Sequence, residues 1–177
     1  MNQKSLGKSN FFFDWVMPVG IAFLIVLLIN RFLIFQIKVP TGSMIPTIEK
    51  NDRLLVSRIY NYDSIKRGDV LVFVSREYNS QWFVKRVVGL PGETVDIDDT
   101  GKVYINGKEL KEDYVKHPSP KEGHFKIPEG KYLMLGDNRE ISEDARYWNN
   151  PYIDKSDIKG KVRFTILPLD RIGTIKL

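Results

Sequence analysis

A long apolar run near the amino end constrains this chain more than any other feature of its sequence. From Trp15 to Phe35 the only strongly polar residues are Asn30 and Arg31. An α-helix of about 20 apolar residues crosses the roughly 30 Å hydrocarbon core of a bilayer. Arg31 falls near the end of the run, where a long side chain can reach the membrane interface. The run predicts a transmembrane anchor over residues 15–35, between a short tail (1–14) and a folded domain (36–177).

A cleaved signal peptide is the competing interpretation of the same run, with Lys4 and Lys8 as its basic start. The run is long for such a segment, and no small-x-small cleavage site follows it closely. The nearest such triplet, Thr41-Gly42-Ser43, comes several residues too late. An uncleaved anchor is therefore the better interpretation. Basic residues on the two sides of the run are nearly balanced, so the residues alone do not set its orientation.

The composition excludes several chemistries. There are no cysteines, which rules out disulfides, thiolate zinc sites and cysteine nucleophiles. His117 and His124 fall in a Pro/Lys-rich stretch that indicates a solvated loop, without the further ligands that a metal site needs. The formal net charge is +5, and most of this excess precedes Val39, so no basic face for nucleic acid is expected in the folded part. Neither a metal nor an organic cofactor is implied.

Strand signals dominate from residue 39 onward. Short segments rich in β-branched and aromatic residues alternate with turn sequences such as Asn106-Gly107. The segments are DRLLVSRIY (52–60), GDVLVFV (68–74), WFVKRVVGL (82–90), GETVDI (92–97), KVYINGKEL (102–110), KYLMLGDN (131–138) and KVRFTILPL (161–169). Helical periodicity is weak, and residues 111–122 are the best loop candidate. We predict a mainly β fold, in which an all-β domain of coiled antiparallel sheets with long loops follows the anchor.

A serine stands soon after the apolar run, in the segment VPTGSMIPT (39–47). Gly42 would let the backbone come close to a substrate, and Thr41 adds a second hydroxyl two residues before Ser43. The Ser43 amide and the Thr41 hydroxyl could together hold an oxyanion. The same segment could be an irregular linker in which Met44 packs and nothing reacts. The segment alone does not decide between the two interpretations.

A serine nucleophile needs a base, and neither histidine is well placed to serve. A lysine made neutral by burial is the alternative: lowering its pKa from about 10.4 to about 7–8 needs roughly 4 kcal/mol, which burial can supply. Lys85 is the lysine that lies inside an apolar strand segment. Strand alternation places Phe83 and Val87 on its face, where they would exclude water from the amine. Alternation also leaves open a lysine that reaches solvent.

A third group of polar residues follows the apolar segment YLML, in GDNREISEDAR (136–146). A surface turn is the simplest interpretation. The density of hydrogen-bonding side chains and the position directly after a strand favour a functional loop instead.

Together these segments resemble the bacterial type I signal peptidases, membrane-anchored proteases with a serine and a lysine at the active site. Four elements match in the same order: the amino-terminal anchor; PTGSMIPT, with serine followed by methionine and proline; KRVVGLPGE, with lysine ahead of Arg-x-x-Gly-x-Pro-Gly; and GDNREISEDARYW, matching Gly-Asp-Asn-x-x-x-Ser-x-Asp-x-Arg. The similarity covers nearly the whole chain, which is short like the compact Gram-positive members of the family.

The resemblance implies a serine endopeptidase that removes signal peptides through an acyl-enzyme. Ser43 would be the nucleophile, and Lys85 the general base that later protonates the leaving amine. Thr41 and the Ser43 amide would hold the oxyanion. The substrates would be preproteins with small residues at −1 and −3, bound as an added strand. The lipid bilayer would be a further partner and the secretion machinery a candidate one, with the amino terminus in the cytoplasm and the catalytic domain outside the plasma membrane.

The resemblance also implies supporting residues. Ser142 would hydrogen-bond the Lys85 amine and orient it. The residues that would brace this loop or pack beside the nucleophile are Asp137, Asp144, Arg146 and Met44. Ala145 departs from the family pattern, because many members have serine there. Ser142 is therefore the only hydroxyl of the pair that this chain keeps.

Two other functions stand as alternatives. A non-catalytic, membrane-held β scaffold for surface-protein or pilus assembly could share the fold, although such a protein could lose the serine and the lysine that this chain keeps. A self-cleaving serine/lysine regulator would need a DNA-binding or polymerase-associated part, and a transmembrane anchor has no place in it.

Overall fold

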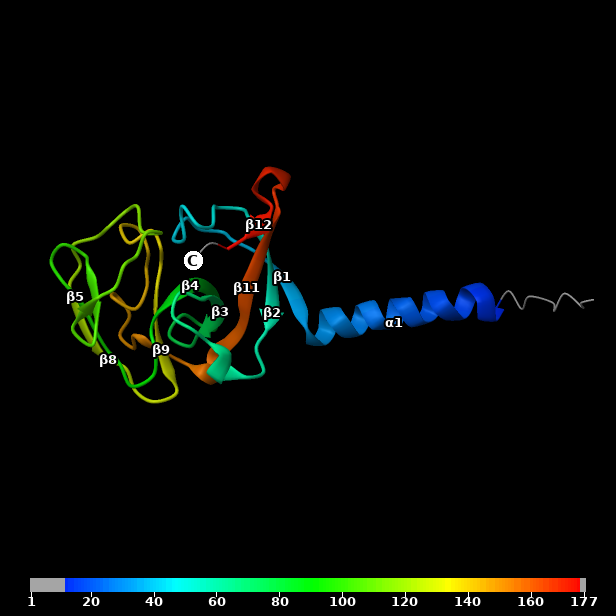
Figure 1. Cartoon of the computed structure of the whole chain (residues 1–177), viewed down its shortest axis with the longest axis horizontal. Helices are drawn as coiled ribbons and strands as arrows, with labels where there is room; N and C mark the ends of the chain where they lie inside the picture. The colour runs from blue at the N-terminus through cyan, green and yellow to red at the C-terminus, as the bar shows by residue number, and fades with distance from the viewer. Residues whose placement is uncertain (1–11, 176–177) are drawn as a thin grey trace, which may run out of the picture. The chain divides into compact units, whose positions relative to one another are not determined.

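The computed structural model of the chain describes residues 12–175 (Figure 1). The chain divides into two compact units, Met1–Ile34 and Phe35–Leu177. The first contains one long helical segment, and the second contains the folded domain.

The helical segment of the first unit has the length and composition needed to cross a membrane. A π-helical turn over Phe12–Val16 continues into α1, Met17–Phe32, and together they form an apolar helix of 21 residues with every side chain exposed. The predicted anchor over 15–35 extends past this helix, because strand β1 begins at Ile34. Apolar residues suit either element, so composition alone did not separate them. The predicted tail, 1–14, lies outside the described residues except for its last three.

The second unit is built on two antiparallel sheets. The larger has the strand order β1-β2-β11-β3-β4-β9-β10, with β12 added to β11, and the smaller has the order β7-β6-β5-β8. The larger sheet contains β1 (Ile34–Lys38), β2 (Arg53–Arg58), β3 (Val70–Ser75), β4 (Gln81–Gly89), β9 (Lys131–Leu135), β10 (Tyr152–Asp154), β11 (Ile158–Leu167) and β12 (Gly173–Thr174). The smaller contains β5 (Thr94–Ile97), β6 (Val103–Ile105), β7 (Lys108–Glu109) and β8 (Gly123–Lys126). The other elements described within residues 12–175 are the 3-10 turns η2 (Tyr62–Ser64), η3 (Lys155–Asp157) and η4 (Leu169–Arg171).

The predicted mainly β fold is confirmed, and every predicted strand segment contains a strand. The sequence did not predict β1, β8, β10 or β12. The first was hidden in the apolar run, and the other three are too short for a pattern of alternation to stand out. The predicted loop, 111–122, lies between β7 and β8 and holds no strand of its own.

Two apolar clusters fill the second unit. The larger is shared by both sheets and includes Phe73 of β3 and Val87 of β4. The smaller is built on β2 and β3 and takes in Met44 and Ile48 from the segment after β1. A fully buried apolar side chain of this size stabilises a fold by about 1.5–3 kcal/mol. Because Met44 is the residue next to Ser43, its burial in this cluster holds the backbone at Ser43 against the core.

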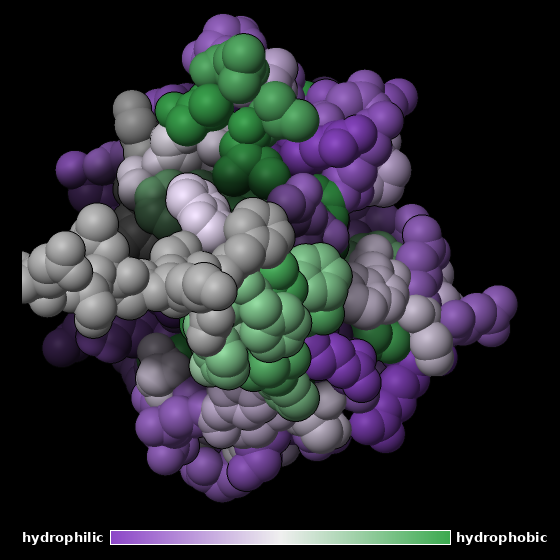
Figure 2. All heavy atoms as spheres, turned by 90° about the vertical axis from the view of Figure 1, so that its right-hand side faces the viewer, coloured by the Kyte–Doolittle hydropathy of each residue, from purple (hydrophilic) through white to green (hydrophobic). Residues whose placement is uncertain are grey.

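Part of the surface of the second unit is also apolar. Figure 2 shows such side chains gathered at the top of the view, over η4 and β12. Leu169 is 75% exposed and Ile172 is 59% exposed at this end of the unit. Single exposed apolar residues are ordinary, whereas a group of them marks a contact surface.

The core placement of Phe73 predicts a large cost for its removal. Its ring lies 6.0 Å from that of Phe83 and packs edge-on against Trp148. We expect Phe73→Ala to lower the free energy of unfolding by about 3–5 kcal/mol, because a cavity remains. The measurement is urea denaturation of the full-length protein in detergent. Phe164→Ala is the control, since Phe164 is 44% exposed. Equal losses for the two variants would contradict the assigned core.

Candidate active site

The segment between β1 and β2 forms a fixed turn that carries Ser43. Its ends are joined by backbone hydrogen bonds: Val39 N–H donates to the Asp52 carbonyl at 3.0 Å, and Asn51 N–H donates to the Val39 carbonyl at 2.7 Å. Within the turn Met44 is fully buried, whereas Ser43 is half-buried and lines a pocket. The segment is thus held in place, unlike a loose linker.

Two hydrogen-bond donors lie close to the Ser43 hydroxyl. The Thr41 hydroxyl is 3.4 Å from it, and both residues line the same pocket. Within the described part of the chain, the backbone N–H of Ser43 has no acceptor, whereas the Ile45 N–H donates to the Gly42 carbonyl. An amide and a hydroxyl so placed can stabilise a negative oxygen that forms at Ser43.

Lys85 is buried in the middle of β4, opposite Leu71 of β3, with only 2% of its surface exposed. Its amine donates a hydrogen bond to Ser142 Oγ at 2.9 Å. Burial lowers the pKa of Lys85 from 10.5 to about 8, because the ammonium loses its hydration, while the charges of Asp144 and Arg146 act in opposite directions. The alternative of a solvent-reaching lysine is therefore excluded.

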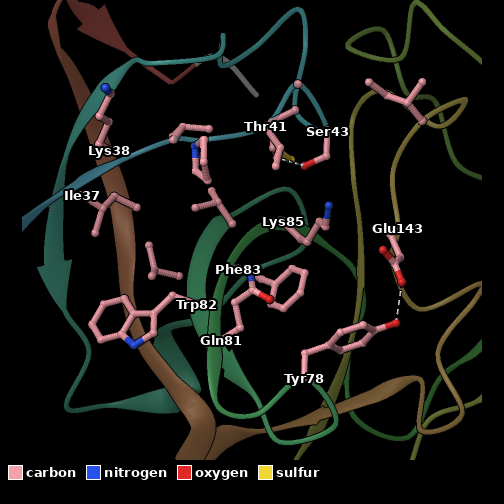
Figure 3. A pocket seen from close by; sticks show the side chains of 17 residues that line it. Ile37, Lys38, Thr41, Ser43, Tyr78, Gln81, Trp82, Phe83, Lys85 and Glu143 are labelled. Carbon is pink, nitrogen blue, oxygen red and sulfur yellow. Dashed lines mark hydrogen bonds between the residues drawn. The ribbon is translucent and has the colours of Figure 1, made fainter.

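Ser43 and Lys85 line one pocket of about 310 Å³ (Figure 3). One wall is residues 37–44 and another is the first half of β4, residues 81–85. In Figure 3 the Lys85 amine points toward the turn that carries Ser43 and Thr41. Among residues 12–175 no hydrogen bond joins Ser43 to Lys85. Such bonds are often long before substrate binds, so the shared pocket is compatible with proton transfer.

The loop after β9 places Ser142 against Lys85. Asp144 accepts hydrogen bonds from the Gly136 N–H at 2.9 Å and from Arg146 Nε at 2.8 Å, and the Asp144 and Arg146 side chains are almost fully buried. A Cβ at Gly136 would lie 2.1 Å from Ser142 Oγ and 2.5 Å from the Ser43 carbonyl oxygen. Only glycine fits where the loop passes between the two serines.

Sequence reasoning missed Arg86, which is fully buried beside Lys85 in β4. Its guanidinium donates to Asp137 at 2.8 and 2.7 Å and to the Gly68 carbonyl at 2.8 Å. Thr47 donates to the same carboxylate, so β4, the Ser43 segment and the loop after β9 meet at Asp137. Alternation could have found this residue, because it puts Arg86 on the face opposite Lys85, and a buried arginine needs a partner.

The two histidines stay outside the pocket. His117 lies in the 111–122 loop, within 4.0 Å of Glu140. His124 pairs with Asp96 and lies on β8, where the sequence predicted a loop. Among residues 12–175, no group of three or more His, Cys, Asp or Glu side chains is arranged to hold a metal ion.

The arrangement fits the class of serine hydrolases that use a lysine base. A half-buried hydroxyl, a buried amine with a lowered pKa and two donors for an oxyanion share one pocket.

Comparison with known proteins assigns the family. The family described as signal peptidase, peptidase S26, matches residues 12–167. Signal peptidase I of Leptolyngbya laminosa is 37% identical over 171 residues, which cover 92% of this chain and 83% of that protein. Signal peptidase I of Bacillus licheniformis is 38% identical over 183 residues, which cover 96% of each. The chain therefore belongs to the signal peptidase family, peptidase S26, and is a serine peptidase.

A solved structure of a signal peptidase I from Enterococcus faecalis V583 also aligns, with 33% identity and a TM-score of 0.49, over 55% of this chain and 96% of that one. The resemblance to type I signal peptidases stated from the sequence motifs is confirmed by the family match and the two relatives. The apolar helix of the first unit fits a membrane anchor for this peptidase.

The close fit at Gly136 predicts that even one methyl group will disturb the site. Gly136→Ala should displace Ser142 or the Ser43 backbone, lower peptidase activity by about 100-fold, and destabilise the protein by about 1–3 kcal/mol. Preprotein cleavage and thermal unfolding measure the two effects. Gly173→Ala is the matched control, because nothing lies within 4 Å of its added Cβ. Full activity of Gly136→Ala would contradict this prediction, because it would show that the loop can accommodate a Cβ at this position.

Proposed function

We propose that this chain removes signal peptides from exported preproteins, with Ser43 as the nucleophile and Lys85 as the general base. The observation that carries the proposal is the buried Lys85 amine, held by Ser142 in the pocket that Ser43 lines. The non-catalytic scaffold is not favoured, since a scaffold needs neither a buried lysine nor a serine beside it.

The first half of the reaction acylates Ser43. The neutral Lys85 amine takes the hydroxyl proton of Ser43 while Oγ bonds to the scissile carbonyl carbon. The carbonyl oxygen becomes an oxyanion that accepts hydrogen bonds from the Ser43 amide and the Thr41 hydroxyl. When the intermediate collapses, the C–N bond breaks and the Lys85 ammonium gives its proton to the leaving amine. The mature protein departs, and the signal peptide remains as an ester on Ser43.

The second half returns the enzyme to its starting state. Lys85, neutral again, takes a proton from a water molecule that attacks the ester carbonyl. The oxyanion forms between the same two donors. Its collapse breaks the bond to Ser43 Oγ, which receives the proton from Lys85, and the signal peptide leaves with a free carboxylate.

Ser142 acts on Lys85 in both halves. Its hydroxyl fixes the amine by a hydrogen bond at 2.9 Å, and Asp137, Asp144 and Arg146 brace the loop that presents it. Met44 anchors the nucleophile turn in the core. Ala145 is buried in the larger apolar cluster, so Ser142 alone supplies a hydroxyl to Lys85 at this place.

The substrate binds as an added strand. β9 pairs with β4 only from Arg86 to Gly89, so in the described structure the half of β4 over Gln81–Lys85 has no strand partner on that side. The same half lines the pocket together with the residues after β1. Main-chain groups there can pair with an extended peptide, and the apolar walls suit small residues at −1 and −3.

The helix of the first unit anchors the peptidase in the plasma membrane, with residues 1–14 in the cytoplasm and residues 36–177 outside. The lipid bilayer is then a partner of the whole chain, and Leu169 and Ile172 supply an exposed apolar contact on the second unit. The secretion machinery that delivers preproteins is a candidate partner.

Replacement of either member of the Ser43/Lys85 pair should abolish cleavage. We expect Ser43→Ala and Lys85→Ala to lower the cleavage rate by more than about a thousandfold, because the two groups act as a unit. The assay is cleavage of a preprotein with an A-x-A site by the full-length protein in lipid vesicles. Ser64→Ala and Lys126→Ala are matched controls at exposed positions. Cleavage by Ser43→Ala at the wild-type rate would defeat the proposal.

The lowered pKa of Lys85 predicts the pH dependence. Only the neutral amine can accept the Ser43 proton, so activity is low below the pKa and rises with pH through a midpoint of about 8. The measurement is the pH profile of kcat/KM, with protein stability checked across the range. A midpoint near 10.5, the ordinary value of lysine, would mean that Lys85 is solvated and is not the base.

A further inference from the structure

The loop between β7 and β8 contributes two side chains behind the active site. Glu112 and Tyr114 belong to residues 111–122, which lie outside every motif that identified the site. The Glu112 side chain is 8% exposed, and Tyr114 is half-buried. Neither lines the pocket of Ser43 and Lys85, so neither reaches the reacting atoms.

Glu112 is the carboxylate partner of Arg139, whose side chain is only 2% exposed. Arg139 Nη2 donates to Glu112 Oε1 at 2.6 Å, and Arg139 Nε donates to the Gly136 carbonyl at 2.9 Å. The Tyr114 hydroxyl donates to the same Glu112 oxygen at 2.6 Å. Removing the carboxylate would leave a buried guanidinium without its counterion. Glu112 therefore helps to hold the loop after β9 in place through its ion pair with Arg139.

Tyr114 links the Arg139–Glu112 pair to a second buried ion pair, Arg86–Asp137. Its ring lies under the Arg86 guanidinium, with 4.0 Å from Cζ to the ring centroid, a cation–π distance. Arg86 in turn is bound to Asp137 at the start of the same loop. One side chain thus touches both pairs, through its ring at Arg86 and through its hydroxyl at Glu112.

Backbone contacts complete a short path from the 111–122 loop to both serines. Glu140 N–H donates to the His117 carbonyl at 3.2 Å, and His117 forms a bridge with Asn138. Asn138 N–H donates to the Ser43 carbonyl at 3.1 Å, and its own carbonyl accepts from the Ser142 N–H at 3.0 Å. A displacement of the 111–122 loop would reach Ser43 and Ser142 together.

We propose that Tyr114 and Glu112 are positioning residues for the catalytic lysine, because they hold the buried arginines that fix the loop placing Ser142 Oγ against the Lys85 amine. The inference rests on the proposed peptidase function. If Tyr114 is lost, the loop relaxes, Ser142 moves from the amine, and water enters. The pKa of Lys85 then rises toward its ordinary value.

The expected change in the pKa of Lys85 comes from movement of Ser142, and not from a change of charge near the amine. The charged groups that influence its pKa come from the loop after β9: Asp144, Arg146, Glu143 and Asp137. Glu112 acts on Arg139 and is separated from Lys85 by that loop. A shift in the pH profile after a change at Tyr114 therefore reports the position of Ser142, since a tyrosine that donates to Glu112 carries no charge.

The test compares wild type, Tyr114→Leu and Tyr114→Phe in pH profiles of kcat and KM, using full-length protein in lipid vesicles and a preprotein with an A-x-A site. We expect Tyr114→Leu to lower kcat by about 10–100-fold, to leave KM nearly unchanged, and to move the midpoint of the profile upward. Tyr114→Phe keeps the ring on Arg86 and should recover most of kcat and the midpoint. A folded Tyr114→Leu with the wild-type midpoint would overturn the inference, even if its kcat is low.

Glu112→Gln decides the question if Tyr114→Leu does not fold. It keeps the size of the side chain but removes the counterion of Arg139, and the same upward shift is expected. Glu122→Gln, at an exposed position of the same loop, is the matched control and should match wild type. An unshifted midpoint in Glu112→Gln would reject the positioning role. Cleavage by Ser43→Ala at the wild-type rate would instead reject the proposed function. The two failures are therefore distinct.

Discussion

The burial of one lysine amine is the interaction on which the site depends. A lysine in water stays protonated at neutral pH, and a drop of its pKa to about 8 corresponds to roughly 3 kcal/mol of preference against the charged form. The protein supplies this by pairing β4 with β3, so that the Lys85 stem is enclosed and its amine meets a neutral acceptor, Ser142. A carboxylate in place of that hydroxyl would have raised the pKa.

Three buried ion pairs hold the loop that makes this neutral contact. They are Arg86–Asp137, Arg139–Glu112 and Arg146–Asp144. The desolvation of such pairs offsets most of their attraction, so they are poor sources of stability. Their value here is geometric: each guanidinium fork fixes the direction of the group it binds. The loop after β9 is held by all three, which explains how a segment without a strand or helix keeps one hydroxyl within 2.9 Å of a chosen amine.

Much of the fold and the central part of the site could be predicted from the sequence. The β segments were visible because they are rich in β-branched and aromatic residues and are separated by turn sequences, and Lys85 stood out as a lysine among apolar strand residues. The roles of Ser43, Lys85, Thr41 and Ser142 came from ordered motifs and stay predictions, although the pocket now holds the first three and Ser142 contacts Lys85. The helix end at Phe32 was not predictable, because the residues after it suit a helix in lipid as well as a strand.

Glu112 and Tyr114 lay beyond sequence reasoning for a different reason. A polar loop has no periodicity, so nothing in it marks which side chain turns inward. The partner of Glu112, Arg139, is distant in sequence and lies in a motif that already had an assigned purpose. The contact depends on how two loops pack, which neither loop specifies by itself.

The half-paired strand β4 also affects the tendency of the molecule to aggregate when no substrate is bound. From Gln81 to Val84 the amide and carbonyl groups on one side find no strand partner in the described structure. A bare strand edge accepts any extended chain of low charge, including a partly unfolded copy of itself, and is a starting point for aggregation. Natural proteins usually blunt such edges with charge, and here Gln81, Trp82, Phe83 and Val84 carry none. In the proposed function this edge receives the substrate strand, so the groups that would bind a peptide are the same ones that are exposed to pairing with other chains.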